Sequence, residues 1–328
     1  MTLGLFERSR KQGAALLGAL GNVLAPNVMA AQRWLTDLRT PRPAIRLDGG
    51  SSIAFGDTPR WERFGHAPDA PTLVARINAS VIRGWRDGKF EVATCAALSA
   101  LVRSSTCDEA CVDIRQIDAL NASKSDLHAY QSLDDMADAS CEALLRDRSY
   151  AQLDALMAHR ESRIFHQAGD TLYQQAWNPR VVLMNDGGSH HFVAARRLAG
   201  MLGESVEVTA KATIHRLDPT AVASMAASYE VFAVDRAVVD GPVHEAAMAM
   251  GAAYYTRHLP IPLAKDVAVF LPKDDPRSMR IAAALREGGA TDVNAHLASC
   301  LALQRANEQK PGVLLDDGNQ HRLRPSCR

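Results

Sequence analysis

The residues of this chain that are best suited to chemistry form a single turn at residues 186–191, with the sequence DGGSHH. An apolar, β-branched run ends just before this turn, and a helical pattern of apolar residues begins just after it. The two glycines allow a sharp strand-to-helix turn and let a ligand approach the backbone closely. We predict that Ser189 is the N-cap of the helix. A helix that begins here directs free N–H groups and the positive end of its dipole at the turn, which is typical of a phosphate-binding site.

The polar side chains of the turn are suited to specific catalytic roles. Asp186 is expected to hold Mg²⁺ or to act as a base beside a phosphate, or else to cap the turn. Ser189 is the candidate nucleophile or phosphoryl acceptor, and His190 is the adjacent base that would activate it. The candidate catalytic residues are therefore Asp186, Ser189 and His190. The alternative is a structural corner whose glycines serve only the geometry of the chain.

The predicted binding residues extend over the whole turn and into the helix. They are Gly187, Gly188, Ser189, His190, His191 and Arg196. Arg196 is included because it could reach back along the helix to a phosphate, although most helix arginines extend into solvent. No metal site is predicted at His190 and His191, because consecutive helix residues point about 100° apart and would need a third ligand such as His166 or His215.

The same turn resembles the nucleotide-binding box of the ParB/sulfiredoxin superfamily, in which a strand ends in Gly-x-His-Arg or Gly-Glu-Arg-Arg and continues into an Arg/Ala-rich helix. In this chain DGGSHH is followed by an Ala-Ala helix. The resemblance implies that Gly187, Gly188, Ser189 and His190 hold phosphate. Ser189 occupies the position of the nucleophilic Cys of sulfiredoxins, so sulfinic-acid repair is not expected. His191 replaces the usual Arg, which is a permanent bidentate phosphate donor.

The resemblance covers the turn and its helix closely, and residues 112–218 loosely. It implies a nucleotide- or phosphate-binding protein, with ATP or CTP and Mg²⁺ as the ligands and with hydrolysis or phosphotransfer as the activity. Superfamily topology also implies that His215 and Arg216 lie near the base or ribose, and that Asp113 and Asp118 face the pocket. The alternative is a non-catalytic interaction or DNA-partitioning accessory protein that retains the turn for its structure. The whole chain also resembles an uncharacterised bacterial protein family, which implies a fold but no function.

Composition limits the classes of function. The chain has 37 Lys+Arg and 37 Asp+Glu among 328 residues, and this zero net charge argues against broad, non-specific binding of nucleic acid. A hydrophobic content of 47% is that of a globular protein, and no apolar run is long enough for a membrane span. Six scattered cysteines predict reduced thiols and a cytoplasmic protein. Cys107 and Cys111 could share a helix face or ligate a metal, but no second pair completes a zinc site. Residues 1–30 have the outline of a signal peptide, and we favour an amphipathic helix there.

Periodicity predicts an α/β (α+β) fold. Strands are expected at 112–117, 180–184, 206–215, 229–234 and 267–272, and helices at 3–38, 72–87, 92–102, 132–146, 150–159, 220–228, 242–258, 276–287 and 292–307. We therefore predict a ParB/sulfiredoxin-like mixed sheet with surrounding helices over residues 106–328. A mostly helical and irregular region is expected at residues 1–105.

Overall fold

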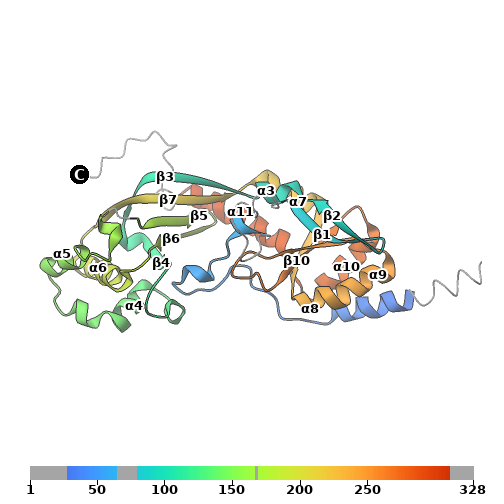
Figure 1. Ribbon diagram of the computed structural model, residues 1–328, viewed down its shortest axis with the longest axis horizontal. Coiled ribbons are helices and arrows are strands. Elements are labelled where there is room, and N and C mark those ends of the chain that lie inside the picture. The colour runs from blue at the N-terminus through green and yellow to red at the C-terminus, as the bar shows by residue number, and fades with distance from the viewer. Residues whose placement is uncertain (1–27, 65–79, 167–168, 311–328) are drawn as a thin grey trace, which may run out of the picture.

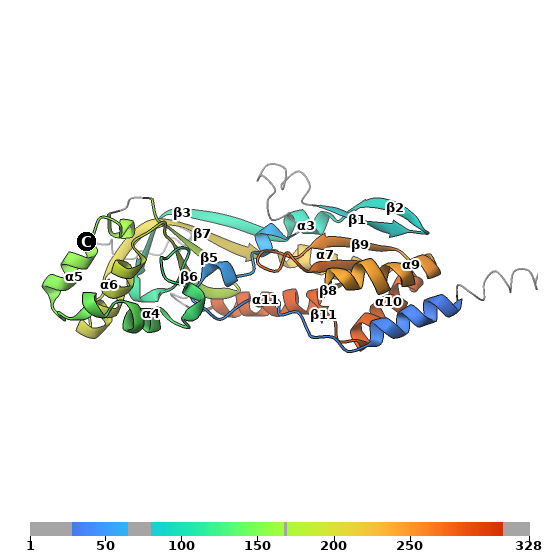
Figure 2. The same cartoon turned by 60° about the horizontal axis from the view of Figure 1, so that its bottom comes forward.

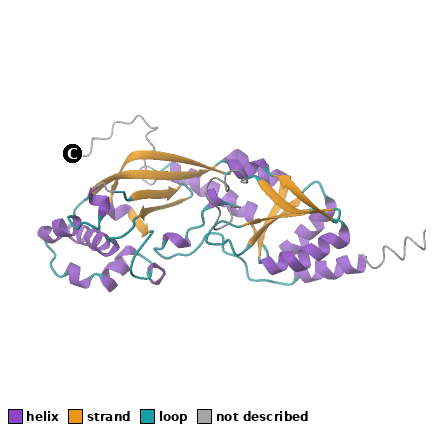
Figure 3. Ribbon diagram, in the orientation of Figure 1, coloured by secondary structure: helices purple, strands orange, loops and turns teal. Residues whose placement is uncertain are grey.

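The computed structural model describes residues 28–64, 80–166 and 169–310. Two β-sheets lie side by side along an elongated molecule, and helices pack around each of them (Figures 1 and 3). One mixed sheet, one antiparallel sheet and the helices packed on them confirm the predicted α+β class.

The five-stranded sheet carries the predicted turn. Its strand order is β3 (Val102–Asp113), β7 (Glu207–Leu217), β5 (Thr171–Gln175), β6 (Asn178–Met184) and β4 (Ile117–Leu120). The β5–β7 and β4–β6 pairs are parallel, whereas β3–β7 and β5–β6 are antiparallel. One face of the sheet is covered by α4 (Leu133–Ser140), α5 (Tyr150–Met157) and α6 (Ser189–Leu202), whose apolar side chains form one core with it.

The six-stranded sheet is antiparallel throughout. Its strand order is β11 (Thr291–Asp292), β8 (Tyr229–Val234), β10 (Val267–Pro272), β9 (Tyr254–His258), β1 (Val81–Arg86) and β2 (Lys89–Thr94). Alternate residues of β8 enter two different cores: Val231 and Ala233 face one, and Phe232 and Val234 face the other. Helices therefore cover both faces of this sheet.

The helices divide between these two faces. Those on the first are α3 (Ala96–Ala100), α7 (Pro219–Ser228) and α11 (Val293–Glu308). Those on the second are the helix of residues 28–39, α8 (Arg236–Val238), α9 (His244–Met250) and α10 (Pro276–Glu287). A π-helical turn at Val239–Val243 joins α8 to α9.

The two halves of the molecule are joined by long strands and by one helix. β3 and β7 run from the five-stranded sheet toward α3 and α7, and α11 lies between the two sheets (Figures 1 and 2). The buried Gln304 of α11 accepts the N–H of Leu217 at 2.8 Å and donates to its carbonyl at 3.2 Å. Asn307 donates to the carbonyl of Ala176 at 2.9 Å. Buried amides of α11 thus satisfy backbone groups at one end of the five-stranded sheet.

Three helix predictions, at 72–87, 92–102 and 242–258, were wrong for part of their described residues, and only Ala96–Ala100 of the second is helical. Residues 81–94, expected to be largely helical, form the β1–β2 hairpin, because Asp87 (φ 50°) and Gly88 (φ 73°) form a tight turn of positive φ that aligns two strands. The helix expected at 242–258 ends at Met250, where Gly251 (φ 64°) caps it in the left-handed conformation, and Tyr254–His258 is β9. The strand expected at 112–117 is interrupted by a 3₁₀ turn at Ile114–Gln116.

The other expected elements are present. The strands at 180–184, 206–215, 229–234 and 267–272 are confirmed, as are the helices near 132, 150, 220, 276 and 292. Ser132 caps α4 in a capping box with Asp135. Residues 28–39 of the expected N-terminal helix are helical, whereas residues 1–27, with most of the targeting-segment prediction, lie outside the described residues. The predicted boundary at residue 105 falls within β3, and the hairpin that precedes it belongs to the six-stranded sheet.

The cysteines differ from expectation. Cys107 and Cys111 lie on β3 rather than on a helix face. Cys111 is disulfide-bonded, so the prediction of reduced thiols is wrong for this residue, whereas Cys95, Cys141 and two others are free. In the described ranges of the chain, no helix is both long and apolar enough to cross a membrane.

A buried carboxyl joins the N-terminal segment to the five-stranded sheet. Glu62, in the 3₁₀ turn Trp61–Arg63, accepts the hydroxyl proton of Tyr173 on β5 at 3.2 Å. Its second oxygen, Oε2, is buried without a hydrogen-bond partner among the described residues. Burial raises the pKa of Glu62 to about 7, against the opposing effect of Tyr173 and of the neighbouring Arg60.

We expect the Glu62→Gln variant to be more stable than the wild type at alkaline pH and to differ little at acidic pH. Glutamine keeps an acceptor for Tyr173 and removes the charge. Between the ordinary pKa of 4.5 and the folded pKa of about 7, the folded protein holds a proton that the unfolded chain has lost. The stability of the wild type therefore falls as pH rises through this window, by roughly 3 kcal/mol at about pH 8.

Urea unfolding of both proteins over a series of pH values measures this difference. The exposed Glu245 supplies the matched control, and Glu245→Gln should give no gain that grows with pH. A stability difference for Glu62→Gln that stays constant across the pH range would contradict the buried, proton-binding carboxyl.

Candidate functional site

The turn at residues 186–191 follows the end of β6 and opens α6, as the sequence predicts. It is held by Asn185, a residue that is only 1% exposed. Its Oδ1 accepts the backbone N–H groups of Asn121 and Ala122 at 3.2 and 3.1 Å. Its Nδ2 donates to the carbonyls of Ala122 and Gly187 at 2.8 and 2.9 Å. The turn is thereby tied to the loop that follows β4.

The two glycines of the turn differ in why a side chain is absent at their positions. Gly188 (φ 65°) is the N-cap of α6, so the prediction of Ser189 at this position was wrong by one residue. A Cβ on Gly188 would lie 2.2 Å from the carbonyl oxygen of Glu161. Gly188 is therefore needed for the close packing of the segment after α5. A Cβ on Gly187 (φ 138°) would meet nothing within 4 Å, so this glycine faces open space.

Serines surround His190. The Oγ of Ser189 donates to the Oγ of Ser123 at 2.9 Å, and it lies 3.4 Å from Nδ1 of His190. Nε2 of His190 lies 2.9 Å from the Oγ of Ser125. Among the described residues, no carboxylate contacts His190, so the third member of a nucleophile–base–acid arrangement is not formed. Ser189 is also only 4% exposed, and it would have to rotate to reach a substrate.

The turn lines a cavity of about 880 Å³. The residues around it are Ala122, Ser123, Lys124, Arg160, Glu161, Arg163, Asp186, Gly187, Gly188, Ser189, His190 and His191. The structure therefore brings together all the site residues predicted within the turn, whereas Arg196 of the following helix does not line the cavity. Three further cations, Lys124 from the loop after β4 and Arg160 and Arg163 from the segment after α5, were not predicted to belong to the site.

The charges of this cavity are unevenly paired. Arg163 contacts Asp186 at 3.3 Å and Asp170 at 3.5 Å. The side chain of Asp186 is 94% exposed, so this ion pair is weak and is readily exchanged for a ligand. Lys124 and Arg160 form no ion pair with any other described residue. Three cations, Lys124, Arg160 and Arg163, line the cavity with two carboxylates, Asp186 and Glu161, so that its lining has a small excess of positive charge.

Two stacked imidazole rings lie at the edge of the cavity. The rings of His191 and His159 are 3.4 Å apart and nearly parallel, at 5°. Burial lowers the pKa of His191, and the charges of His159 and His190 act in the same direction against the opposing effect of Glu161. His191 therefore favours the neutral form, and an anion bound beside it would favour its protonation.

Arg196, which was expected to bind phosphate with the turn, lies outside this cavity. It is about two helical turns from the N-terminus of α6. Its three guanidinium nitrogens donate to the carbonyls of Ile117 and Arg115 and to Asp134, at 3.0, 3.1 and 2.6 Å. Arg196 thus ties α6 to the start of β4 and to α4, and it cannot reach the turn without breaking these bonds.

The residues proposed from superfamily topology do not line this cavity. His215 is buried on β7, 2.8 Å from the Oγ of Ser104, and burial lowers its pKa to about 4. Arg216 contacts Ser105 and Glu308. Asp113 pairs with Arg115. These side chains are occupied in structural contacts.

Metal ligands are few in the described parts of the chain. No group of three His, Cys, Asp or Glu side chains among them could hold an ion. Mg²⁺ that accompanies a nucleotide takes most of its ligands from phosphate and water and needs only one or two carboxylates. Asp186 and Glu161 line the cavity and are of the right type for this role.

Comparison with known proteins identifies a family but no individual relative. A family model described as a family of unknown function (DUF6685) matches residues 107–310, which is more than half of the chain and includes every residue that lines the cavity. No curated protein and no solved structure matches the chain.

We expect Gly188→Ala to destabilise the protein by about 2 kcal/mol or more, because its methyl group would overlap the backbone of Glu161 and the left-handed φ would be strained. The matched control is Gly200→Ala in the same helix, where a Cβ meets nothing within 4 Å. That variant should be neutral or more stable by up to about 1 kcal/mol. Denaturant unfolding measures both, and equal stabilities of the two variants would show that the Gly188 contact is unimportant.

Proposed function

We propose that this chain, which belongs to the family of unknown function DUF6685, binds a nucleotide or another phosphate-bearing small molecule at the 186–191 turn. One observation carries the proposal. The N-terminus of a 14-residue helix and the cations Lys124, Arg160 and Arg163 converge on the same cavity.

The backbone of the turn suits phosphate oxygens. The first N–H groups of a helix have no acceptor within it, and in α6 the N–H of Phe192 is bonded to the carbonyl of Gly188 at 3.0 Å. The preceding N–H groups of the first turn are therefore the donors nearest to the cavity. The open face of Gly187 lets a ligand oxygen approach them.

The unpaired side chains add charge to this backbone site. Lys124 and Arg160 approach from two other segments, and an arginine guanidinium binds phosphate through two parallel hydrogen bonds. Arg163 can exchange its contact with the exposed Asp186 for the ligand. A cavity of about 880 Å³ has the size of a small-molecule site and admits a nucleotide. We propose ATP or CTP with Mg²⁺ as the ligand, with Asp186 and Glu161 as the carboxylates near the metal.

Hydrolysis or phosphotransfer is the activity that this arrangement would support. Phosphoryl transfer depends mainly on positioning and on electrostatic stabilisation of the transferred group, and a basic cavity at a helix N-terminus provides both. His190 is the candidate base, held by Ser125 and Ser189. The ParB/sulfiredoxin-like character of the site is supported by the same strand–turn–helix sequence, in which β6 leads into α6.

A second candidate function is a non-catalytic interaction or DNA-partitioning accessory protein. The packing of Gly188 against Glu161 favours it, because this contact would retain the glycine even without a ligand. The two candidates differ in whether the cations of the cavity matter for binding a small molecule.

Isothermal titration with ATP, CTP, pyrophosphate and phosphate, each with and without Mg²⁺, tests the proposal. We expect at least one of them to bind the wild type, and Lys124→Gln and Arg160→Gln each to weaken that binding about tenfold or more, because a charge-assisted hydrogen bond is lost. The control is Lys89→Gln, an exposed lysine on β2 in the other half of the molecule, which should bind as the wild type does.

His190→Gln separates binding from turnover: it should retain the ligand and lose phosphate release if His190 is the base. If none of the four compounds binds at millimolar concentration, the proposal is rejected and the accessory-protein function is favoured. Binding that is unchanged in both cation variants would place the ligand elsewhere.

A further inference from the structure

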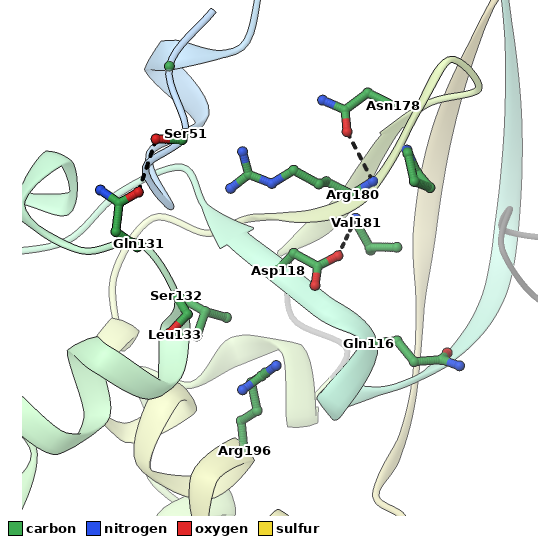
Figure 4. A pocket seen from close by; sticks show the side chains of 12 residues that line it. Ser51, Gln116, Asp118, Gln131, Ser132, Leu133, Asn178, Arg180, Val181 and Arg196 are labelled. Carbon is green, nitrogen blue, oxygen red and sulfur yellow. Dashed lines mark hydrogen bonds between the residues drawn. The ribbon is translucent and has the colours of Figure 1, made fainter. Parts of the chain in front are cut away.

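A second cavity, of about 730 Å³, lies against the edge of the five-stranded sheet (Figure 4). It is lined by Gly50, Ser51, Gln116, Asp118, Gln131, Ser132, Leu133, Asn178, Pro179, Arg180, Val181 and Arg196. These residues come from the loop before the 3₁₀ turn at Phe55–Asp57, from the 3₁₀ turn at Ile114–Gln116, from β4 and β6, from the start of α4 and from α6. None of them lines the cavity at the 186–191 turn.

Asp118 brings a negative charge into this second cavity. It lies where the β4–β6 ladder is irregular, between the Ile117–Val181 and Ala119–Val182 pairs. Its Oδ2 accepts the N–H of Val181 at 3.1 Å, and Oδ1 has no partner among the described residues. Burial raises the pKa of Asp118, and the positive charges of Arg180 and Arg196 oppose this shift.

Arg180 brings a positive charge that is also partly buried. Its Nη2 donates to the carbonyl of Ser52 at 2.8 Å, and its other guanidinium nitrogens have no partner among the described residues. Burial lowers the pKa of Arg180, against the effect of Asp118 and Asp57. The guanidinium extends toward Ser51 and Gln131 (Figure 4). Within the described chain, Arg180 and Asp118 form no ion pair with each other.

Arg196, unlike Asp118 and Arg180, has no free hydrogen-bonding group to offer a ligand. Its nitrogens are all occupied by two carbonyls and by Asp134, so that its charge is already paired. It forms a wall of the cavity, below Asp118 in Figure 4. The charges left for a ligand are therefore one anion, Asp118, and one cation, Arg180.

Two partly desolvated opposite charges that do not meet are unfavourable unless a third molecule pairs with both. A simple anion would be repelled by Asp118, and a simple cation by Arg180. Among the described residues, no aromatic side chain lines the cavity for a sugar ring to stack on. The amides of Gln131 and Asn178 provide neutral polar contacts between the two charges.

We propose that this cavity binds a small zwitterion of the α-amino acid class, with its carboxylate on Arg180 and its ammonium group on Asp118. The planar guanidinium of Arg180 suits a carboxylate through two parallel hydrogen bonds. The unpartnered Oδ1 of Asp118 accepts an N–H of the ammonium group, while Oδ2 keeps its bond to the sheet. This site is independent of the phosphate site proposed above.

Isothermal titration of the full chain with each standard amino acid tests the proposal, followed by the N-acetyl and carboxamide derivatives of the tightest binder. Each derivative removes one ligand charge and should bind about 30-fold more weakly or worse, as when one partner of a buried charge pair is lost. The variants Asp118→Asn and Arg180→Gln should each weaken the binding of the parent amino acid to a similar extent. Asparagine at position 118 keeps an acceptor for the N–H of Val181. Arg197→Gln on α6, next to the cavity wall at Arg196, and Lys124→Gln at the other cavity should leave the binding of the amino acid unchanged.

Because the derivatives are titrated into the unaltered protein, the test stands even if a variant fails to fold. The proposal is overturned if no amino acid binds, if the derivatives bind as well as the parent, or if binding survives both Asp118→Asn and Arg180→Gln. Titration with glucose and with phosphate completes the test. If one of them binds the wild type and binds the Arg180→Gln variant more weakly, the cavity is assigned to that ligand instead.

Discussion

The side-chain amide of Asn185 is the interaction on which the candidate site depends. It is buried, and it satisfies backbone groups of Asn121, Ala122 and Gly187, so that one side chain fixes two segments 63 residues apart in sequence. Without it these backbone groups would be left unpaired away from water, at a cost comparable to several lost hydrogen bonds. The basic loop that carries Lys124 is held beside the N-terminus of α6 by this contact.

The same three elements, β4, β6 and α6, supply both cavities. The loop after β4 and the first turn of α6 line the first cavity, whereas Asp118 of β4 and Arg196 of α6 line the second. Arg196 connects them further, because it bonds the carbonyl of Ile117 at the start of β4. A displacement of α6 along its axis would therefore alter both cavities together.

The sequence predicts what is local in this structure. The strand, the turn and the helix around residue 187 have a continuous pattern, and the structure has them in that order. Lys124 and Arg160 could not be assigned to the site, because nothing in their own neighbourhood indicates which loops meet. The β1–β2 hairpin was missed although Asp87-Gly88 is a typical hairpin turn, since apolar residues at helical spacing competed with it. Arg196 was misplaced because helical spacing does not reveal that other carbonyls take its donors.

The amides of α11 set a limit on how the molecule can respond to a ligand. Gln304 and Asn307 hold the end of the five-stranded sheet to a helix that belongs to the core of the other sheet. A hinge motion between the two halves would break these buried bonds, and long β3 and β7 would have to bend as well. The enclosure of a small molecule must then come from short segments close to it, such as the loop at residues 121–125 and the segment at 159–163. Selectivity in this protein would be a property of those segments, and not of a domain closure.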